Sequence, residues 1–296
     1  MTDCAALAAA LAEPLAGTAP VAPAWLCLEQ PGPWGNDALA DSHLDSGTGA
    51  ELNRRMKGTG VRVVLIRRPG RHPDLHRPRP RRVYLASTRP GASWLARNTV
   101  DDAKQLLDLD FTALAHGDRQ GFGTLTADPL LLVCTNGKRD RCCALLGRPI
   151  AAELAAQHGE AVWESTHTGG HRFAPAVVAL PTGYVHGRLD GQQTRRLLTA
   201  TAAGEILAEG CRGRATWTRA GQAAELAVRE LTGDRDANSL AVQGDEALPS
   251  GEHMVTVAHN DGRLWRVRVV EEIQRPPRAN SCGKAPTEPV SFRAIL

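Results

Sequence analysis

The sequence predicts a mixed α/β fold, because short apolar runs typical of buried strands alternate with Ala- and Leu-rich segments typical of helices. The clearest example is the apolar run 129–133, which is followed by a helical segment at 144–158, with Pro149 suited to its first turn. A hairpin pattern comes next, with strands at 176–180 and 184–189 on either side of a Pro-Thr-Gly turn. At 296 residues, the chain is long enough for two or three such units.

The remaining elements are expected from the same patterns. Before residue 124 we expect a short N-terminal helix, strands at 25–29, 61–66, 82–86 and 93–98, and helices at 38–56 and 101–107. After the hairpin we expect helices at 191–208 and 222–231, strands at 253–259 and 264–270 around an Asn-Asp-Gly turn, and an irregular tail from residue 275.

Composition points to a globular protein of a reducing compartment. The seven cysteines are odd in number and scattered, which argues against a disulfide framework. Asp3 stands where an export signal would carry positive charge, and no apolar run reaches the length of a membrane span. We therefore expect a cytoplasmic protein that does not contact the membrane.

The net charge of +3 is too small to indicate nucleic-acid binding. Arg67 to Arg82 contains seven arginines interleaved with prolines, but no aromatic side chain that could stack on a base. We interpret this segment as a solvated extended loop. The alternative is an electrostatic docking surface for an acidic redox partner.

Two cysteine and two histidine positions form the most informative pattern in the chain. Cys134 ends the apolar strand, and the adjacent Cys142 and Cys143 open the following helix, where the helix dipole favours a thiolate. His167 and His171 then flank two glycines, which indicates a loop wrapped around a ligand. Two soft thiolates followed by two imidazoles are the ligands of a metal or iron–sulfur site.

This order of elements resembles the thioredoxin-like [2Fe-2S] ferredoxins, in which the second ligand pair is also cysteine. With His-x3-His in its place, the chain is similar to the sucrase/ferredoxin-like family, whose members bind a [2Fe-2S] cluster through two cysteines and two histidines. The resemblance extends to residues 13–20, 31–35 and 281–284. It implies an N-terminal α/β region at 1–123, a thioredoxin-like ferredoxin domain at 124–210 and a small α+β extension at 211–296. No carboxylate pair supports a sucrase activity.

The resemblance also assigns the ligands. It places them at Cys134, His167 and His171, with Cys143 as the second thiolate and Cys142 as the alternative. The other cysteines are all expected to be small buried apolar residues: Cys4, Cys27, Cys211 and Cys282. This expectation is weakest for Cys282, because its Ser-Cys-Gly-Lys setting recurs in the family.

The resulting hypothesis is an electron carrier with one [2Fe-2S] cluster and no enzymatic activity of its own. Neutral imidazoles make the cluster easier to reduce and allow proton-coupled transfer of one electron. No nucleotide-binding motif is present, so a protein redox partner is expected to supply the electrons. We expect the partner to approach the histidine edge, with Arg172 as a positive rim. A Cys2His2 zinc site and a thiol redox protein are the alternatives.

Overall fold

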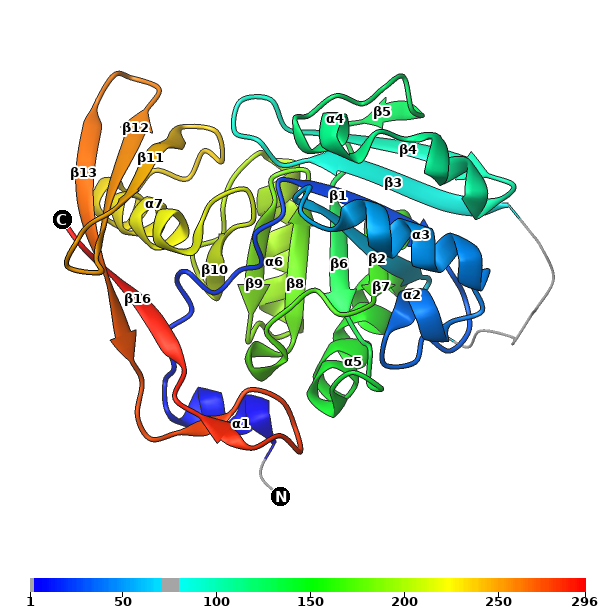
Figure 1. Ribbon diagram of the computed structural model, residues 1–296, viewed down its shortest axis with the longest axis horizontal. Coiled ribbons are helices and arrows are strands. Elements are labelled where there is room, and N and C mark those ends of the chain that lie inside the picture. Colours follow the sequence, from blue (N-terminus) through cyan, green and yellow to red (C-terminus); the bar gives the residue numbers. More distant parts are fainter. Residues whose placement is uncertain (1–2, 71–79) are drawn as a thin grey trace.

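The computed structural model describes residues 3–70 and 80–296 and contains a ten-stranded sheet as its central feature (Figure 1). The strand order is β10-β9-β8-β6-β7-β2-β1-β3-β4-β5. The strands of its first half are β1 Ala24–Glu29, β2 Val61–Arg67, β3 Arg81–Ser87, β4 Trp94–Val100 and β5 Thr124–Thr126. The strands of its second half are β6 Leu130–Cys134, β7 Val162–Ser165, β8 Ala176–Leu180, β9 Tyr184–Gly187 and β10 Cys211–Arg214.

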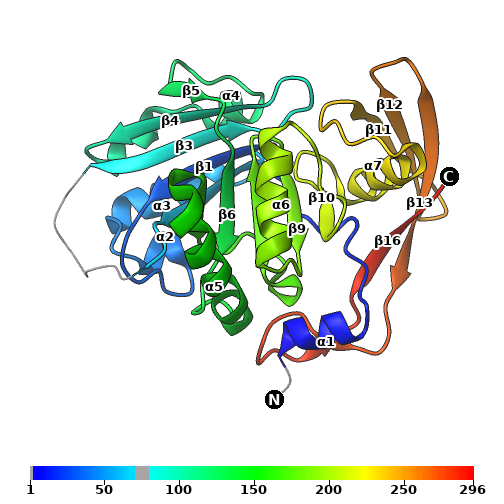
Figure 2. The ribbon, with the colours of Figure 1, turned by 180° about the vertical axis from the view of Figure 1, so that it is seen from behind.

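Helices cover both halves of this sheet, and a separate four-stranded sheet follows at the C-terminal side (Figure 2). The α-helices are α1 Cys4–Ala10, α2 Ala38–Asp41, α3 Ser46–Met56, α4 Phe111–Ala115, α5 Arg141–His158, α6 Gly191–Ala202 and α7 Arg219–Thr232. The 3-10 helices are η1 Ala103–Asp108, η2 Gly159–Ala161 and η3 His171–Phe173. The remaining strands are β11 Leu240–Ala247, β12 His253–His259, β13 Leu264–Ile273, β14 Arg278–Ala279, β15 Pro286–Thr287 and β16 Val290–Ile295.

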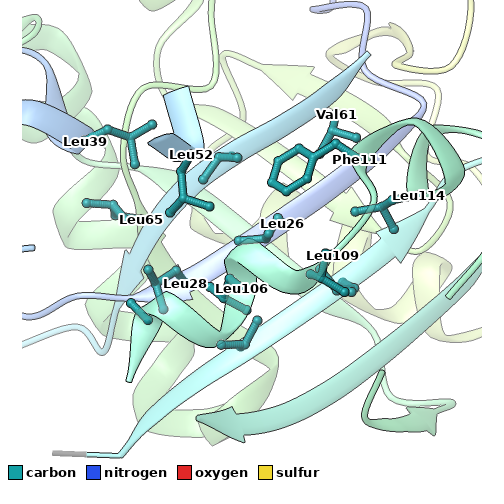
Figure 3. Packing of buried hydrophobic residues seen from close by; sticks show 14 of the residues in the cluster. Leu26, Leu28, Leu39, Leu52, Val61, Leu65, Leu106, Leu109, Phe111 and Leu114 are labelled. Atoms are coloured by element: carbon teal, nitrogen blue, oxygen red, sulfur yellow. The ribbon is translucent and has the colours of Figure 1, made fainter. Parts of the chain in front are cut away.

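Successive side chains of a strand point to opposite faces of the sheet, and this divides the core into layers. On one face of the first half, Leu26 and Leu28 of β1 pack with Leu52 of α3 and Leu106 of η1 (Figure 3). The alternate residues of β1 point the other way and pack with β6 and β8 of the second half, so the two halves of the sheet share a buried layer. On the outer face of the second half, α5 and α6 cover β6 and β8.

Between the two halves, β2 and β7 pair over two positions only, Ile66 with Ser165 and Arg67 with Glu164. Arg67 and Glu164 also form a largely buried ion pair of 2.7 Å. The predicted boundaries at residues 123 and 210 stay a prediction, but one continuous sheet runs through the first two predicted regions.

The second half contains the elements expected around the site. β6 is parallel to β7 and antiparallel to β8, β8 and β9 form the predicted hairpin, and α6 follows. The C-terminal hairpin of β12 and β13 is also confirmed, with Gly262 at φ 96° in its turn. In that unit, α7 packs on one face of β11, β12, β13 and β16.

Three predicted helices differ from the structure in their bounds or in their type. The expected helix at 38–56 is broken into α2 and α3, because Asp45 caps a new start by accepting from the backbone N–H of Thr48. The expected helix at 101–107 is the 3-10 helix η1. The helix expected to reach residue 208 ends at Ala202, since the chain turns at Gly204 with φ 72°.

Two further expectations need correction. Pro149 lies inside α5 and not in its first turn, because Asp140 caps the helix well upstream. Proline has no N–H to donate, so the carbonyl of Leu145 lacks its helical hydrogen bond; Leu145 is exposed. The tail from residue 275 is not irregular, since β14 pairs with β15, and β16 joins the edge of β13. Strands β10 and β11 were not predicted.

The centre of the arginine-rich segment, with Arg71, Arg77 and Arg79, lies outside the described residues. Arginines on either side of this centre have partners. Arg68 forms an ion pair with Glu160 at 2.5 Å, and Arg81 donates a hydrogen bond to Gln30. None of the helices in the described part of the chain combines the length and apolar character that a membrane crossing requires.

His186 on β9 predicts acid sensitivity of the fold. Its ring is fully buried, and burial lowers its pKa to about 4. The unfolded chain, with a histidine pKa of about 6.5, binds a proton that the folded chain rejects. The free energy of unfolding should therefore fall as pH drops from about 6.5 to about 4, by at most about 3 kcal/mol. Urea unfolding of wild type and His186→Gln should show a smaller pH slope in the variant; equal slopes would exclude this histidine as the cause.

Candidate metal centre

Cys134 lies at the end of β6, where α5 returns closely across the strand. Cys134 is 1% exposed and Cys143 is fully buried. The close approach requires Gly147, because a Cβ there would lie 2.4 Å from the carbonyl oxygen of Cys134. The helix is thereby fixed against the strand that carries the first thiol.

The start of α5 is set by Asp140, whose carboxylate accepts from the backbone N–H of Cys142 at 2.9 Å. Cys142 and Cys143 both fall in the first turn, as expected. Being successive helical residues, they point in different directions. The Cys143 sulfur lies close to the ligand atoms of Cys134 and His167. The Cys142 sulfur belongs to a separate group that contains Cys4 and Cys282.

The histidine loop is held open by backbone conformations that favour glycine. Gly169 and Gly170 have φ values of 100° and 75°, so no helix connects the two histidines. Arg212, only 1% exposed, donates to the Gly169 carbonyl at 3.0 Å and to the Thr18 hydroxyl at 3.0 Å. A buried arginine from β10 therefore sets the shape of the loop.

The first half of the sheet supports the same loop from the other side. The backbone of Leu65 on β2 exchanges two hydrogen bonds with Thr166, through its N–H to the threonine hydroxyl and through its carbonyl from the threonine N–H. Arg62 donates to the His167 carbonyl at 2.9 Å. The N-terminal region thus positions His167.

Four sequence-predicted ligands converge, three of them tightly. The ligand atoms of Cys134, Cys143 and His167 all lie within 4.8 Å of one another. The His171 ring stands beside that of His167, with centroids 4.8 Å apart and planes tilted by 34°, but it is not part of the three-residue group.

The two thiols have opposite acidities. The Cys143 thiol donates to the Cys134 sulfur, and this bond outweighs burial in lowering the pKa of Cys134 well below its usual value. The same bond, together with burial, raises the pKa of Cys143. Burial lowers the pKa of His171, which keeps its ring neutral and able to bind a metal.

Several buried polar atoms on the segments that carry these residues have no partner among the described residues. Nδ1 of His167 and Nδ1 of His171 have no hydrogen-bond partner among the described residues, and the same holds for the Thr168 hydroxyl and the Asn136 amide nitrogen. Such atoms are costly unless something binds them. The residues present therefore fit a metal or cluster with nitrogen and sulfur ligands.

The histidine edge is the accessible one. Both histidines are half-buried, unlike the two thiols, and a cavity of about 500 Å³ opens beside His167. Arg172 does not form the expected positive rim, because its side chain is only 17% exposed and pairs with Glu13 at 2.7 Å. Exposed cations at the cavity come from Lys57 and Arg139 instead.

Comparison with known proteins agrees with this arrangement. The sequence model of the sucrase/ferredoxin-like family matches residues 15–213, well over half of the chain. The chain belongs to the sucrase/ferredoxin-like family. Searches of curated proteins and of solved structures each gave no match. The family match covers all four candidate ligands but ends before residues 281–284, where we also expected a resemblance.

Sequence reasoning missed three residues that support the site. Gly147 could have been noticed as a glycine inside a helical pattern, which often marks close packing. Arg62 and Arg212 carried no signal, because a buried arginine in a strand cannot be distinguished from an exposed one by its neighbours in sequence.

Replacing Gly170 tests the support of the histidine loop. A Cβ there would lie 2.2 Å from Nη2 of Arg212, whereas a Cβ at Gly204, with a similar φ of 72°, would meet nothing within 4 Å. Gly204→Ala should cost about 1 kcal/mol of unfolding free energy from backbone strain alone. Gly170→Ala should cost about 2 kcal/mol more and lower the metal content per chain. Denaturant unfolding and metal analysis measure both; equal losses in the two variants would exclude a role for Arg212.

Proposed function

We propose that this protein is an electron carrier with a [2Fe-2S] cluster held by Cys134, Cys143, His167 and His171. The observation that carries the proposal is the convergence of two buried thiols with two histidines whose Nδ1 atoms are buried and unpartnered. Membership of a ferredoxin-like family supports it. When bound, the cluster would supply one-electron redox chemistry.

The surrounding fold supports the same proposal. The sequence of elements β6-α5-β7, then the hairpin β8-β9 and α6, with strand order β7-β6-β8-β9, is consistent with a thioredoxin-like ferredoxin domain. Histidine ligands that retain one N–H can take up a proton when the site gains an electron, so proton-coupled transfer is part of the proposal.

We further propose that electrons come from an acidic protein partner and that the protein has no enzymatic activity of its own. The histidine edge opens on the cavity lined by Lys57 and Arg139, both exposed. Opposite charges would steer the partner to this edge.

A mononuclear zinc site is the second candidate. It is favoured by one observation: of the four candidate ligands, Cys134, Cys143 and His167 form a group as tight as a single ion requires, and His171 stands outside it. Zinc carries no visible absorption, so colour separates the two candidates.

Adjacent cysteines provide a matched test. Cys143→Ser should abolish or strongly change the visible spectrum and lower the iron content, because a thiolate ligand is lost. Replacement of Cys134, His167 or His171 should have the same effect, because each also removes a ligand. Cys142→Ser should keep both, since Cys142 belongs to another group of side chains. Absorption spectra and iron analysis of protein purified without oxygen give the result. Bleaching by Cys142→Ser alone would reverse the choice of thiol, and a colourless wild type that contains zinc and no iron would favour the zinc candidate.

The docking proposal predicts a salt-dependent rate. Lys57→Glu combined with Arg139→Glu should slow reduction by an acidic partner at least about tenfold at low ionic strength, and the difference should shrink as salt is added. Arg266→Glu on β13, an exposed position in the other sheet, is the control. Stopped-flow reduction at matched midpoint potential measures the effect. Equal rates for the double variant and the control would exclude this edge as the docking site.

A further inference from the structure

Three cysteines that are far apart in the sequence lie close together in the fold. Cys4 is the first residue of α1, Cys142 is in the first turn of α5, and Cys282 follows β14. Their sulfur atoms form a triangle, with 3.4 Å between Cys142 and Cys282, 3.6 Å between Cys282 and Cys4, and 3.7 Å between Cys4 and Cys142. Nothing in the spacing of Cys4 and Cys282 along the sequence indicates that they meet.

A carboxylate completes the group. The two oxygens of Asp140 lie 3.7 and 3.6 Å from the Cys4 sulfur. The Asp140 carboxylate is oriented by three further bonds, accepting from the backbone N–H groups of Cys142 and Cys282 and from the Ser281 hydroxyl. One potential ligand atom from each of Cys4, Asp140, Cys142 and Cys282 lies within 4.8 Å of all the others.

These distances match the edges of a zinc tetrahedron. Zinc–sulfur bonds of about 2.3 Å place two thiolates roughly 3.8 Å apart, and a zinc–oxygen bond of about 2.0 Å places the oxygen roughly 3.5 Å from each sulfur. A disulfide instead needs about 2.05 Å between sulfurs and would leave the third thiol unused. All three cysteines are free in the structure.

The donor set also suits a soft divalent cation. Asp140 is 3% exposed, and the hydrogen bonds to its carboxylate come from neutral groups: the Cys142 and Cys282 backbone, the Ser281 hydroxyl and the Cys4 thiol. A buried anion next to three polarisable thiols is the environment that a soft divalent metal stabilises.

Other contacts bring α1 and the segment around β14 and β15 together at this place. Buried Glu13, which follows α1, accepts from Arg278 of β14 at 2.8 Å and from Arg172 at 2.7 Å. In both overall views, α1 lies beside the segment that precedes β16 (Figures 1 and 2). The thiols at Cys4 and Cys282 are thus positioned by the folded chain before any metal binds.

We propose that Cys4, Cys142, Cys282 and Asp140 bind one zinc ion. Zinc would replace three thiol protons, which pass to solvent, and would bond to three thiolates and one carboxylate oxygen. This second site is structural: it fastens α1 and the segment between β14 and β15 to the first turn of α5, the turn that also carries Cys143. None of its ligands belongs to the [2Fe-2S] proposal, and Cys4 and Cys282 lie outside the residues matched by the family.

Metal analysis of variants tests the site independently of the cluster. Protein purified without chelators should contain one zinc per chain. Cys4→Ser and Cys282→Ser should each lower zinc at least tenfold while keeping visible absorption and iron. Cys143→Ser should do the reverse, losing iron and keeping zinc. Cys211→Ala, a buried cysteine outside both groups, is the control and should keep both metals.

A second measurement does not depend on whether the variants fold. X-ray absorption at the zinc edge of the wild-type protein should show about three sulfur neighbours near 2.3 Å and one oxygen. The proposal is overturned if wild type holds no zinc even after zinc is added and excess is dialysed away, or if zinc has only nitrogen and oxygen neighbours. It is equally overturned if Cys143→Ser removes the zinc while Cys4→Ser does not, or if mass spectrometry finds a disulfide within the triangle.

Discussion

The first turn of α5 is the constraint on which the rest of the site depends. Asp140 caps this turn, and Gly147, two turns later, lets the helix approach the Cys134 carbonyl without a clash. Because successive residues of a helix point in different directions, one turn presents Cys143 to the candidate metal centre and Cys142 to a second group of thiols. A shift of the helix by one residue would turn one of these thiols away from its group.

Around this turn, the chain brings together segments that are distant in sequence. The histidine loop is held by Arg62 of β2 and Arg212 of β10, two arginines that are largely buried and donate to backbone carbonyls. Glu13, which follows α1, holds the β14 segment near this turn, because its buried carboxylate accepts from Arg278 and also from Arg172. The candidate metal centre is therefore supported by charged side chains from several distant segments. The N-terminal region contributes to that support through Arg62 and Glu13.

Much of the second half of the sheet could be predicted, since its signals are local. The apolar run before Cys134, the hairpin around Gly183 and the glycines between His167 and His171 each restrict the backbone within a few residues. Predictions failed where a cap or a long-range partner decides the outcome. The helix at 38–56 is interrupted by the cap at Asp45, and β16 was missed because its pairing partner β13 stabilises it across a long loop.

By itself, the sequence determined three candidate ligands, a pair of thiols for the fourth, and the family, because residue type and spacing carry that information: sulfur and imidazole donors in short loops suit few purposes other than metal binding. Only the tertiary structure decided which of two adjacent thiols faces Cys134, and that Cys4 and Cys282 meet Cys142. The direction of a side chain depends on where its helix begins and packs. The meeting of residues 278 positions apart depends on buried contacts, here those of Glu13, that leave no periodic trace in the sequence.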